Sequence, residues 1–385
     1  MLRYLTAGES HGQCLTTIIE GIPAGLKLSA EAVNAQLERR QRGYGRGKRM
    51  LIERDRVRIT SGVRGGFTLG SPVCLEIQNK DWDNWRDYMA PGIEANLKEK
   101  RITQPRPGHA DLAGGIKYRH RDLRNVLERA SARETAARVA AGSVARVFLE
   151  ALGVIINSHV VRIGEVEVDY KDLNLGNIAD AAKSPVMCMD TGKSEEMVEA
   201  ISKAAQAGES LGGVFEVLID NVPAGLGSYV HWDRRLDGLL AQAFLSIPGI
   251  KGIEFGLGFK GASMYGSEVH DEIHYSEECG YYRTTNNAGG IEGGMSNGER
   301  IIIRAAMKPI PTMVNSLTSV DILTKTPVKA AVERADVCAV PAAAVVAEAA
   351  AAFTLAQVFL EKFGGDYMEE VFANVARYRG YERQV

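Results

Sequence analysis

A short motif of histidine, serine and glycine is the first stretch of this chain that could do chemistry. Residues 6–13 read TAGESHGQ and place His11 between Ser10 and Gly12. One interpretation is an ordinary turn, because glycine adopts backbone angles that other residues avoid. The other is a proton-transfer group within reach of a small molecule, since imidazole gains and loses its proton near neutral pH. A lone motif favours the turn, so the rest of the chain must decide.

A run of basic residues follows at positions 38–50, ERRQRGYGRGKRM. It contains Arg39, Arg40, Arg42, Arg46, Lys48 and Arg49. Charge runs of this kind are commonly solvated faces. Here glycines at positions 43, 45 and 47 alternate with the charges, which suits a loop that closes over a small anion.

Two later motifs could also bind an anion. QPRPGHAD, residues 104–111, holds Arg106 and His109 in a turn that prolines stiffen. ERASARET, residues 128–135, opens a long helix, for which its serine and second glutamate fit a capping box. A helix N-terminus with two arginines beside Ser131 is suited to an anion.

A third candidate lies near the C-terminal end of the chain. KPIPT, residues 308–312, cannot be helical because of its prolines, so Lys308 should be held in place. In VERADV, Arg334 and Asp336 are two positions apart and would lie on one side of an extended segment. A structural ion pair is the alternative for that pair.

Composition limits the class of ligand. The chain has 385 residues, a formal net charge of −2 and 7% aromatic residues. Nucleic acid would need a continuous basic surface with aromatic residues for stacking, and Tyr44 is the only aromatic residue of the arginine run. Separated arginine motifs in a nearly neutral chain therefore favour a compact substrate with several negative charges. The five cysteines form no CxxC pair, which argues against structural zinc and for reduced thiols in the cytoplasm.

The chain contains an internal repeat. GQCLTTIIEGIPAGL at 12–26 resembles GGVFEVLIDNVPAGL at 212–226, and each reads as a strand that leads into a Pro-Ala-Gly turn. GVRGGFTLGSPV at 62–73 aligns with GFKGASMYGSEV at 258–269. We predict one α/β (α+β) domain over residues 1–385, made of two pseudo-twofold-related halves that repeat at about 10–75 and 210–270. Helices are expected to cover the outer faces of its sheets.

Four helices are predicted. One follows Ser29 as N-cap and runs to Arg42, and one spans roughly 233–246. A third starts at Ser131 and has apolar residues at every fourth position. The run at 337–360 is the most apolar, but a proline and charged and polar residues interrupt it. It reads as a buried helix rather than a membrane span, and the N-terminal residues lack the apolar core of a secretory signal.

In combination, these motifs resemble the chorismate synthase family over almost the whole chain. The resemblance rests on GESHG (8–12), RRQRGYGRGKRM (39–50), RPGHAD (106–111), ERASARET (128–135), GGMSNG (293–298), KPIPT (308–312) and RADVCAVPA (334–342). It implies a β-α-β sandwich, a homotetramer and the last step of the shikimate pathway. In that step 5-enolpyruvylshikimate 3-phosphate loses phosphate and a ring proton to give chorismate. The family needs reduced FMN although the reaction has no net redox change, and NADPH would enter only as a reductant of that flavin.

The resemblance also implies roles for individual residues. His11 would donate a proton to the flavin, His109 would protonate the departing phosphate, and Asp336 would help to remove the ring proton. The substrate would be bound by Ser10, Arg40, Arg46, Arg49, Arg106 and Arg133. The flavin would be lined by Arg129, Ala130, Ser131, Pro248, Gly249, Gly293, Lys308, Pro309, Ile310, Pro311, Thr312 and Arg334. Many family members have serine at position 130 and asparagine at position 248, so contacts there would be made through the backbone.

Two other classes of function compete with this one. A flavoprotein oxidoreductase would use the same flavin for net redox, but the chain has no dinucleotide-binding fingerprint. An RNA-binding protein would use the arginine run but would leave His109 and Asp336 without a role. Strong salt dependence of RNA binding would favour that class.

Overall fold

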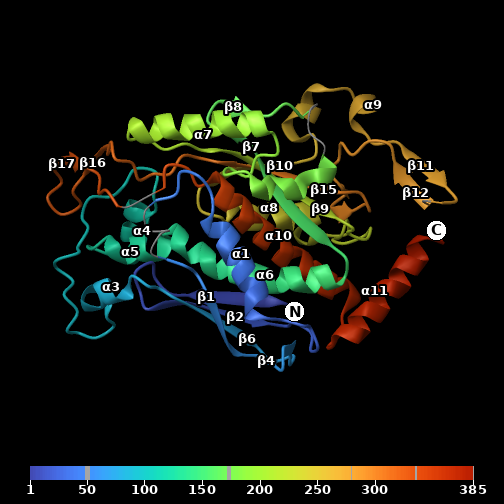
Figure 1. The fold of residues 1–385 in the computed structure, drawn as a ribbon, viewed down its shortest axis with the longest axis horizontal. Coiled ribbons are helices and arrows are strands. Elements are labelled where there is room, and N and C mark those ends of the chain that lie inside the picture. Colours follow the sequence, from blue (N-terminus) through green and yellow to red (C-terminus); the bar gives the residue numbers. More distant parts are fainter. Residues whose placement is uncertain (48–52, 171–174, 279, 334–335, 385) are drawn as a thin grey trace.

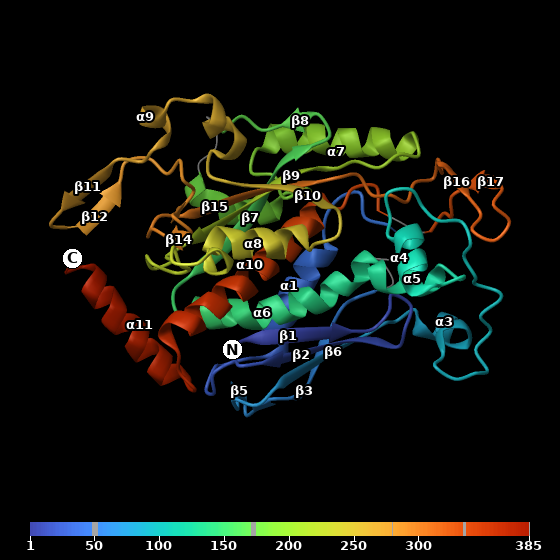
Figure 2. The same ribbon diagram turned by 180° about the vertical axis from the view of Figure 1, so that it is seen from behind.

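Two antiparallel sheets with a layer of helices between them form the core of the structure (Figures 1 and 2). The computed structural model describes residues 1–47, 53–170, 175–278, 280–333 and 336–384. Mixed helix and strand content agrees with the predicted fold class.

The two sheets come from different halves of the chain. The first has the strand order β1 (Arg3–Ala7), β2 (Cys14–Glu20), β6 (Val73–Gln78), β3 (Val57–Ser61). The second has the order β10 (Ile250–Phe255), β15 (Ile301–Met307), β9 (Gly213–Asp220), β7 (Ile155–Ile163), β8 (Val166–Glu167). Neighbouring strands are antiparallel in both. In β2, alternate residues are buried, because one face of the sheet packs on the helices and the other does not.

The helices between the sheets are α1 (Ala30–Gln41), α6 (Thr135–Ala151), α8 (Leu236–Leu245) and α10 (Val340–Phe363). The expectation that helices cover the outer faces is therefore wrong for these four. Buried residues surround α6 and α10 on nearly every side, and such helices have no face to present to solvent. α7 (Thr191–Gln206) lies along the far side of the second sheet, beside β7 and β8 (Figure 1).

The predicted helix boundaries are close to those observed. The Ser29 hydroxyl caps α1 by accepting a hydrogen bond from the Ala32 N–H at 3.3 Å. α8 starts at Leu236, later than expected, because a short 3-10 turn precedes it. Ser131 caps a 3-10 turn, η1 (Ala132–Glu134), rather than α6 itself. The predicted capping box is therefore wrong: the Glu134 carboxylate instead pairs with Arg138.

The apolar run near the C-terminus forms α10, with a proline in its first turn. Length and composition alone would allow this helix to cross a membrane, but 83% of its most apolar window is buried inside the protein. α10 is thus a buried helix, as the sequence predicts. Its place between the two sheets was not predicted.

The two halves share their order of elements. In the first half, the hairpin of β4 (Val63–Arg64) and β5 (Phe67–Thr68) precedes β6; in the second, the hairpin of β13 (Ile291–Glu292) and β14 (Met295–Ser296) precedes β15. The Thr68 hydroxyl donates to the Pro23 carbonyl at 2.6 Å and accepts from the Leu26 N–H at 2.9 Å. Ser296 makes the same two bonds, at 2.6 and 2.9 Å, to the second Pro-Ala-Gly turn.

This correspondence shows that one predicted part of the repeat, the alignment of residues 62–73 with 258–269, is wrong. Residues 258–269 do not resemble the β4–β5 hairpin, because they form a 3-10 helix, η5 (Gly258–Ser263), and α9 (Gly266–Val269). The segment equivalent to 62–73 starts at residue 290, beyond an extension that also contains the hairpin of β11 (Ile273–Ser276) and β12 (Gly280–Arg283). Similar glycine spacing in two unrelated turns produced the misleading alignment.

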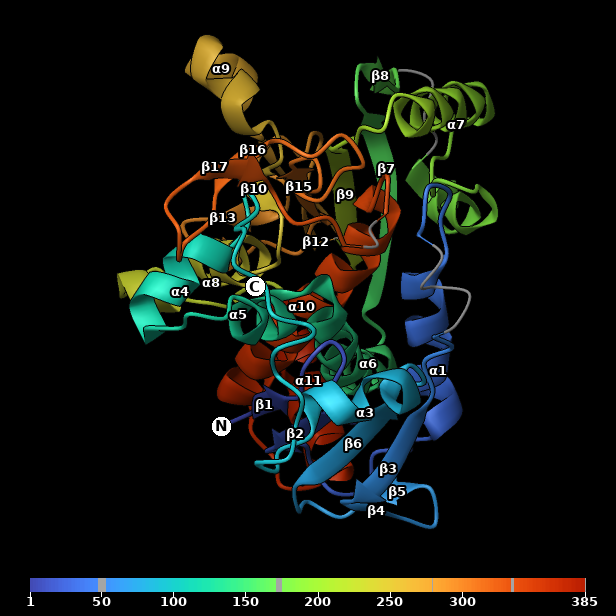
Figure 3. The ribbon, with the colours of Figure 1, turned by 90° about the vertical axis from the view of Figure 1, so that its left-hand side faces the viewer.

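The remaining elements lie mostly at the two ends of the sandwich. Figure 3 views the end that carries α3, α4, α5 and the β16–β17 hairpin. Their bounds, with those of the other short elements, are α3 (Trp82–Met89), α4 (Asp111–Tyr118), α5 (Arg124–Ala130), η3 (Leu175–Lys183), η4 (Trp232–Arg234), β16 (Thr318–Val320), β17 (Pro327–Lys329) and α11 (Met368–Glu382).

Candidate active site

A cavity of about 670 Å³ is lined by segments that are far apart in the sequence. They are the loop after β1, the junction of α5 and α6, the turn between α8 and β10, the segment after β15 and the start of α10. Among its lining residues are Ser10, His11, Arg40, Arg46, Arg106, His109, Arg129, Ala130, Ser131, Arg133, Pro248, Gly249, Lys308, Pro309, Ile310, Pro311, Thr312 and Asp336. The fold thus brings together nearly all of the residues that the sequence singled out.

Three predicted residues are exceptions. Gly293 lies in the turn of the β13–β14 hairpin and is not among the residues that line the cavity. Its positive φ of 58° suits that turn. Arg49 and Arg334 lie outside the residues that the structure describes.

His11 is held by a buried carboxylate. Its Nδ1 lies 2.9 Å from Oε1 of Glu128, and its backbone N–H donates to Oε2 of the same residue at 2.8 Å. The imidazole stacks on Trp85 with ring centroids 3.9 Å apart. Burial alone would raise the pKa of Glu128, but hydrogen bonds from His11 and from Arg124 lower it below its ordinary value.

His109 has a similar partner. Its Nδ1 lies 2.6 Å from Oδ1 of Asp111, which is fully buried. Arg106 binds the same carboxylate through Nε at 2.8 Å and donates to the Thr312 hydroxyl at 3.0 Å. Burial would raise the pKa of Asp111, yet the hydrogen bonds and charges of His109 and Arg106 lower it far below its usual range. The carboxylate is therefore ionised at neutral pH and accepts the Nδ1–H of His109.

Asp336 is paired with the arginine run. Its Oδ2 lies 3.0 Å from Nη1 of Arg46, and its Oδ1 accepts a hydrogen bond from the Gly47 N–H at 2.6 Å. The backbone joins the same two segments, because the Val337 N–H donates to the Gly45 carbonyl at 2.8 Å. The partner of Asp336 among the described residues is Arg46, in the loop after α1. The predicted alternative, an ion pair with Arg334, lies outside the described residues.

Two arginines at the cavity share a buried carboxylate. Arg133 lies 2.5 Å from Oδ1 of Asp55 and Arg40 lies 3.4 Å from Oδ2. Burial, opposed by Asp55 and assisted by the charges of Arg133 and Arg46, lowers the pKa of Arg40 to about 10. Arg40 is still a cation at neutral pH. Nη2 of Arg133 is buried and makes no hydrogen bond to any described residue, but it lies 3.7 Å from Oε2 of Glu53, which is also buried.

Two further cations have no carboxylate partner among the described residues. Arg129 donates to the backbone carbonyl of Gly8 at 2.9 Å, and Lys308 donates to that of Gly108 at 2.5 Å. Burial and the charge of Lys251 lower the pKa of Lys308 from its ordinary value. These backbone contacts orient the two charges without neutralising them.

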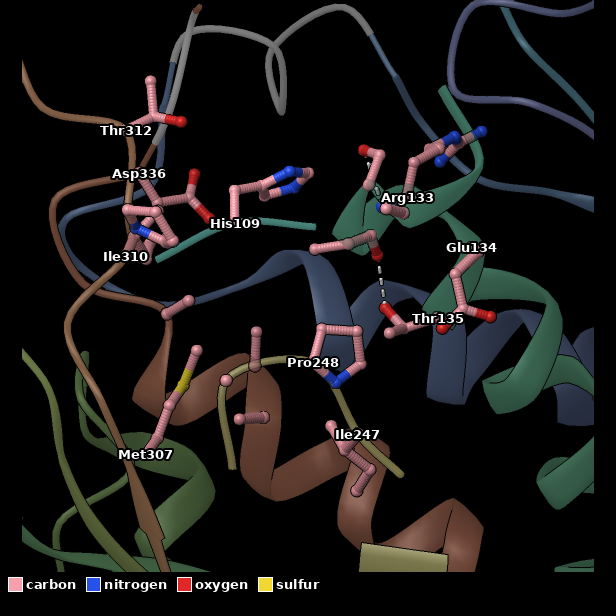
Figure 4. Close-up of a pocket in the computed structure, with 18 of the residues that line it drawn as sticks. His109, Arg133, Glu134, Thr135, Ile247, Pro248, Met307, Ile310, Thr312 and Asp336 are labelled. Atoms are coloured by element: carbon pink, nitrogen blue, oxygen red, sulfur yellow. Dashed lines mark hydrogen bonds between the residues drawn. The ribbon is translucent and has the colours of Figure 1, made fainter. Parts of the chain in front are cut away.

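The cavity also has an apolar wall. Figure 4 shows Asp336, Ile310 and His109 on one side, Arg133, Glu134 and Thr135 on the other, and Pro248 and Ile247 below them. The apolar lining residues are Leu127, Leu245, Ile247, Pro248, Ile250, Met307, Pro309, Ile310, Pro311 and Val346. A flat ring system could lie against such a wall while cations bind its polar groups.

Comparison with known proteins identifies the family. The chorismate synthase profile matches residues 2–360. A chorismate synthase of Desulforudis audaxviator (strain MP104C) is 62% identical over 379 residues, which cover 98% of this chain and 97% of that protein. One from Moorella thermoacetica (strain ATCC 39073) is 58% identical over 385 residues, which cover both chains completely. The chain belongs to the chorismate synthase family.

A solved structure supports the same assignment. A crystal structure of a chorismate synthase has 47% sequence identity and a TM-score of 0.81, and the match covers 100% of this chain and 99% of that one. The chain is accordingly a lyase of aromatic amino-acid biosynthesis. It converts 5-enolpyruvylshikimate 3-phosphate into chorismate and phosphate, the last step of the shikimate pathway.

Sequence reasoning missed two carboxylates next to this cavity. Glu128 and Asp111, the buried carboxylates behind the two histidines, stand inside quoted motifs but were given no role. A carboxylate two positions after His109 in RPGHAD was a readable signal. No spacing rule links His11 to a residue 117 positions away. Arg138 and Lys251 also line the cavity and were not predicted.

Proposed function

We propose that this cavity binds 5-enolpyruvylshikimate 3-phosphate together with reduced FMN and that its histidines and Asp336 move the protons of a 1,4-elimination. The bond between a ring carbon and the phosphate oxygen breaks, a ring C–H bond breaks, and a new double bond forms. Substrate and product then have the same oxidation level. The observation that carries the proposal is a cation-rich cavity lined by Asp336 and by two imidazoles, each bound to a buried carboxylate.

His109 is proposed to protonate the departing phosphate. Asp111 accepts its Nδ1–H, so that Nε2, which lies 3.3 Å from Nη2 of Arg106, is the nitrogen left to transfer a proton. Arg106, held by the same carboxylate, lies beside the imidazole and would stabilise the negative charge on the phosphate.

Asp336 is proposed to take the ring proton, and His11 to hold a proton at the edge of the flavin. Asp336 is the one carboxylate of the predicted set that lines the cavity, and an anion that draws Arg46 away from it would leave it able to accept a proton. His11 is only 8% exposed, which limits exchange of its proton with bulk water.

Arginines are proposed to bind the phosphate and two carboxylates of the substrate. Their planar forks match such oxyanions bidentately. The set is Ser10, Arg40, Arg46, Arg49, Arg106 and Arg133. That Arg40, Arg46, Arg106 and Arg133 all line the one cavity supports this assignment.

The residues of the cavity fit a flavin nucleotide. The apolar wall around Ile247 and Ile310 suits a flat ring system. Arg129 and Lys308, which pair with no carboxylate of the described residues, suit an anionic tail. The proposed flavin set is Arg129, Ala130, Ser131, Pro248, Gly249, residues 308–312 and Arg334. Gly293 is outside it, because its turn does not line the cavity. When bound, reduced flavin supplies electron density to the allylic system as the C–O bond breaks.

Wider features of the family are part of the same proposal. We propose a cytoplasmic homotetramer that has no need of nucleic acid or membrane, with NADPH only as a reductant of the flavin. We also propose that the two halves are related by a pseudo-twofold axis. The order β1-β2-β6-β3 in the first sheet corresponds strand by strand to the order β7-β9-β15-β10 in the second.

An omission experiment tests the proposal. The purified protein is incubated without oxygen with 5-enolpyruvylshikimate 3-phosphate and reduced FMN, and each component is left out in turn. We expect phosphate release only from the complete mixture, with oxidised FMN inactive. Equal release without flavin would remove the cofactor from the proposal.

A further inference from the structure

Glu128 contacts His11 through both of its carboxylate oxygens. Oε1 lies 2.9 Å from Nδ1 of His11, and Oε2 accepts the backbone N–H of the same residue at 2.8 Å. The side chains of His11 and Glu128 are 8% and 1% exposed. The backbone N–H and the ring Nδ1 of His11 are thus matched by the two carboxylate oxygens of Glu128.

The surroundings keep this carboxylate ionised. Arg124, one turn earlier in α5, donates to Oε1 of Glu128 at 3.0 Å and is itself paired with Glu333 at 2.9 Å. The guanidinium of Arg124 also lies 5.0 Å from the ring centroid of Trp85, which stacks on His11. The imidazole is therefore fixed in its plane by Trp85 and along its edge by Glu128.

An ionised carboxylate accepts hydrogen bonds and cannot donate them. Nδ1 of His11 must then carry a hydrogen in the neutral ring as well as in the charged one. No described residue binds Nε2, which is left as the nitrogen that can exchange a proton with a bound molecule.

We propose that Glu128 is a positioning residue, which fixes the Nδ1–H tautomer of His11 so that Nε2 is the atom through which the site transfers a proton. The inference rests on the proposed function for its effect on turnover. Its structural content, the tautomer, is independent of that function.

The tautomer can be measured directly. The wild-type protein is labelled with 15N in its histidine rings, and the His11 signals are assigned by their loss in the variant H11N. In the neutral ring we expect a protonated Nδ1 and an unprotonated Nε2. A proton on Nε2 in the wild-type protein would overturn the proposal, whatever activity the enzyme shows.

Variants of Glu128 then distinguish its positioning role from an effect on folding. E128Q replaces two acceptors by one acceptor and one donor, so it cannot satisfy both the backbone N–H and Nδ1–H of His11. We expect the neutral ring to shift toward the Nε2–H form and kcat to fall by about 10²-fold, with KM within about threefold. E128D keeps the charge and both acceptors and should restore the tautomer and much of kcat.

A matched control exists outside the cavity. His159 and Glu216 form a second buried pair, with Nε2 and Oε2 3.0 Å apart, in the second sheet. E216Q should leave kcat and the His11 tautomer unchanged even if it lowers the melting temperature. Loss of kcat in E128Q with an unaltered tautomer would contradict the positioning role, as would equal loss in E216Q. If the wild type releases no phosphate, the proposed function fails, but the tautomer measurement still decides the role of Glu128.

Discussion

Asp336 and Arg46 form an ion pair at the wall of the cavity, with Oδ2 and Nη1 3.0 Å apart. The other carboxylate oxygen accepts the Gly47 N–H at 2.6 Å. The proposed base and one of the proposed substrate-binding arginines are therefore bound to each other. We expect an incoming phosphate or carboxylate to compete with Asp336 for Arg46, which would couple substrate binding to release of the proposed base.

D336N should abolish turnover while leaving binding nearly intact. Asparagine keeps an oxygen for the Gly47 N–H but cannot accept a ring proton at neutral pH. We expect kcat to fall by about 10²- to 10⁴-fold, with substrate affinity changed by only a few fold. Single-turnover kinetics measure the first quantity and isothermal titration the second. Wild-type kcat in D336N would place the base elsewhere.

H109A should slow phosphate departure without affecting flavin binding. The variant removes the proposed acid, and Asp111 and Arg106 keep their own ion pair at 2.8 Å. We expect kcat to fall by about 10²-fold or more, measured as the rate of phosphate appearance. Fluorescence titration with FMN serves as the control and should match the wild type. Full turnover in H109A would remove this histidine from the mechanism.

E348Q should lower stability and alter its pH dependence. Glu348 is buried in α10, where Arg39 binds it at 2.6 Å and Arg146 at 2.7 Å. Burial raises the pKa of this carboxyl, but the two arginines and Ser158 outweigh it and lower the pKa. Glutamine would leave Arg39 without its carboxylate partner and Arg146 with Glu150 alone, at a cost of about 3–5 kcal/mol in free energy of unfolding.

The sign of the pH effect follows from the lowered pKa. Because the folded pKa of Glu348 lies below the unfolded value of about 4.3, its contribution is complete above that pH. It is lost as the pH falls through the folded value. Urea unfolding between pH 7 and 3 should therefore show a shallower acid loss in E348Q than in the wild type. Parallel curves would show that Glu348 does not couple folding to pH.

G142A should destabilise the protein although alanine favours helices. Gly142 lies in α6 against Ala349 of α10, and a Cβ at this position would overlap the backbone and side chain of Ala349. The helix propensity gain is about 1 kcal/mol, whereas overpacking a close helix contact costs about 1–3 kcal/mol and backbone is what must move here. We expect a lower melting temperature by calorimetry. G380A, in α11 where the Cβ would meet nothing within 4 Å, is the control and should be neutral or stabilising.

Much of the site could be predicted because its residues sit in short motifs. His11, His109, Arg46 and Arg106 stand beside glycines or prolines whose local effect is readable. The partners of these groups could not be predicted in the same way. Glu128 is 117 positions from His11 in the sequence, and Asp336 is 290 positions from Arg46. Hydrophobic periodicity does not predict contacts between side chains so far apart in the sequence.

In the fold, too, features that depend on local sequence were predicted and features that depend on distant contacts were not. The cap at Ser29 and the buried helix near residue 340 depend on local patterns and were predicted correctly. The position of α6 and α10 between the sheets depends on burial around the whole helix, which the four-residue repeat of α6 did not reveal. The wrong repeat partner at 258–269 arose because glycine spacing alone does not distinguish a hairpin from a 3-10 helix.

The most direct test of the account is the stoichiometry of a single anaerobic reaction. The protein is mixed with 5-enolpyruvylshikimate 3-phosphate and chemically reduced FMN, and chorismate, phosphate and the flavin spectrum are followed together. The account predicts equal amounts of chorismate and phosphate, in excess over flavin, with the flavin still reduced at the end. Flavin oxidised in proportion to product, or phosphate released without chorismate, would contradict it.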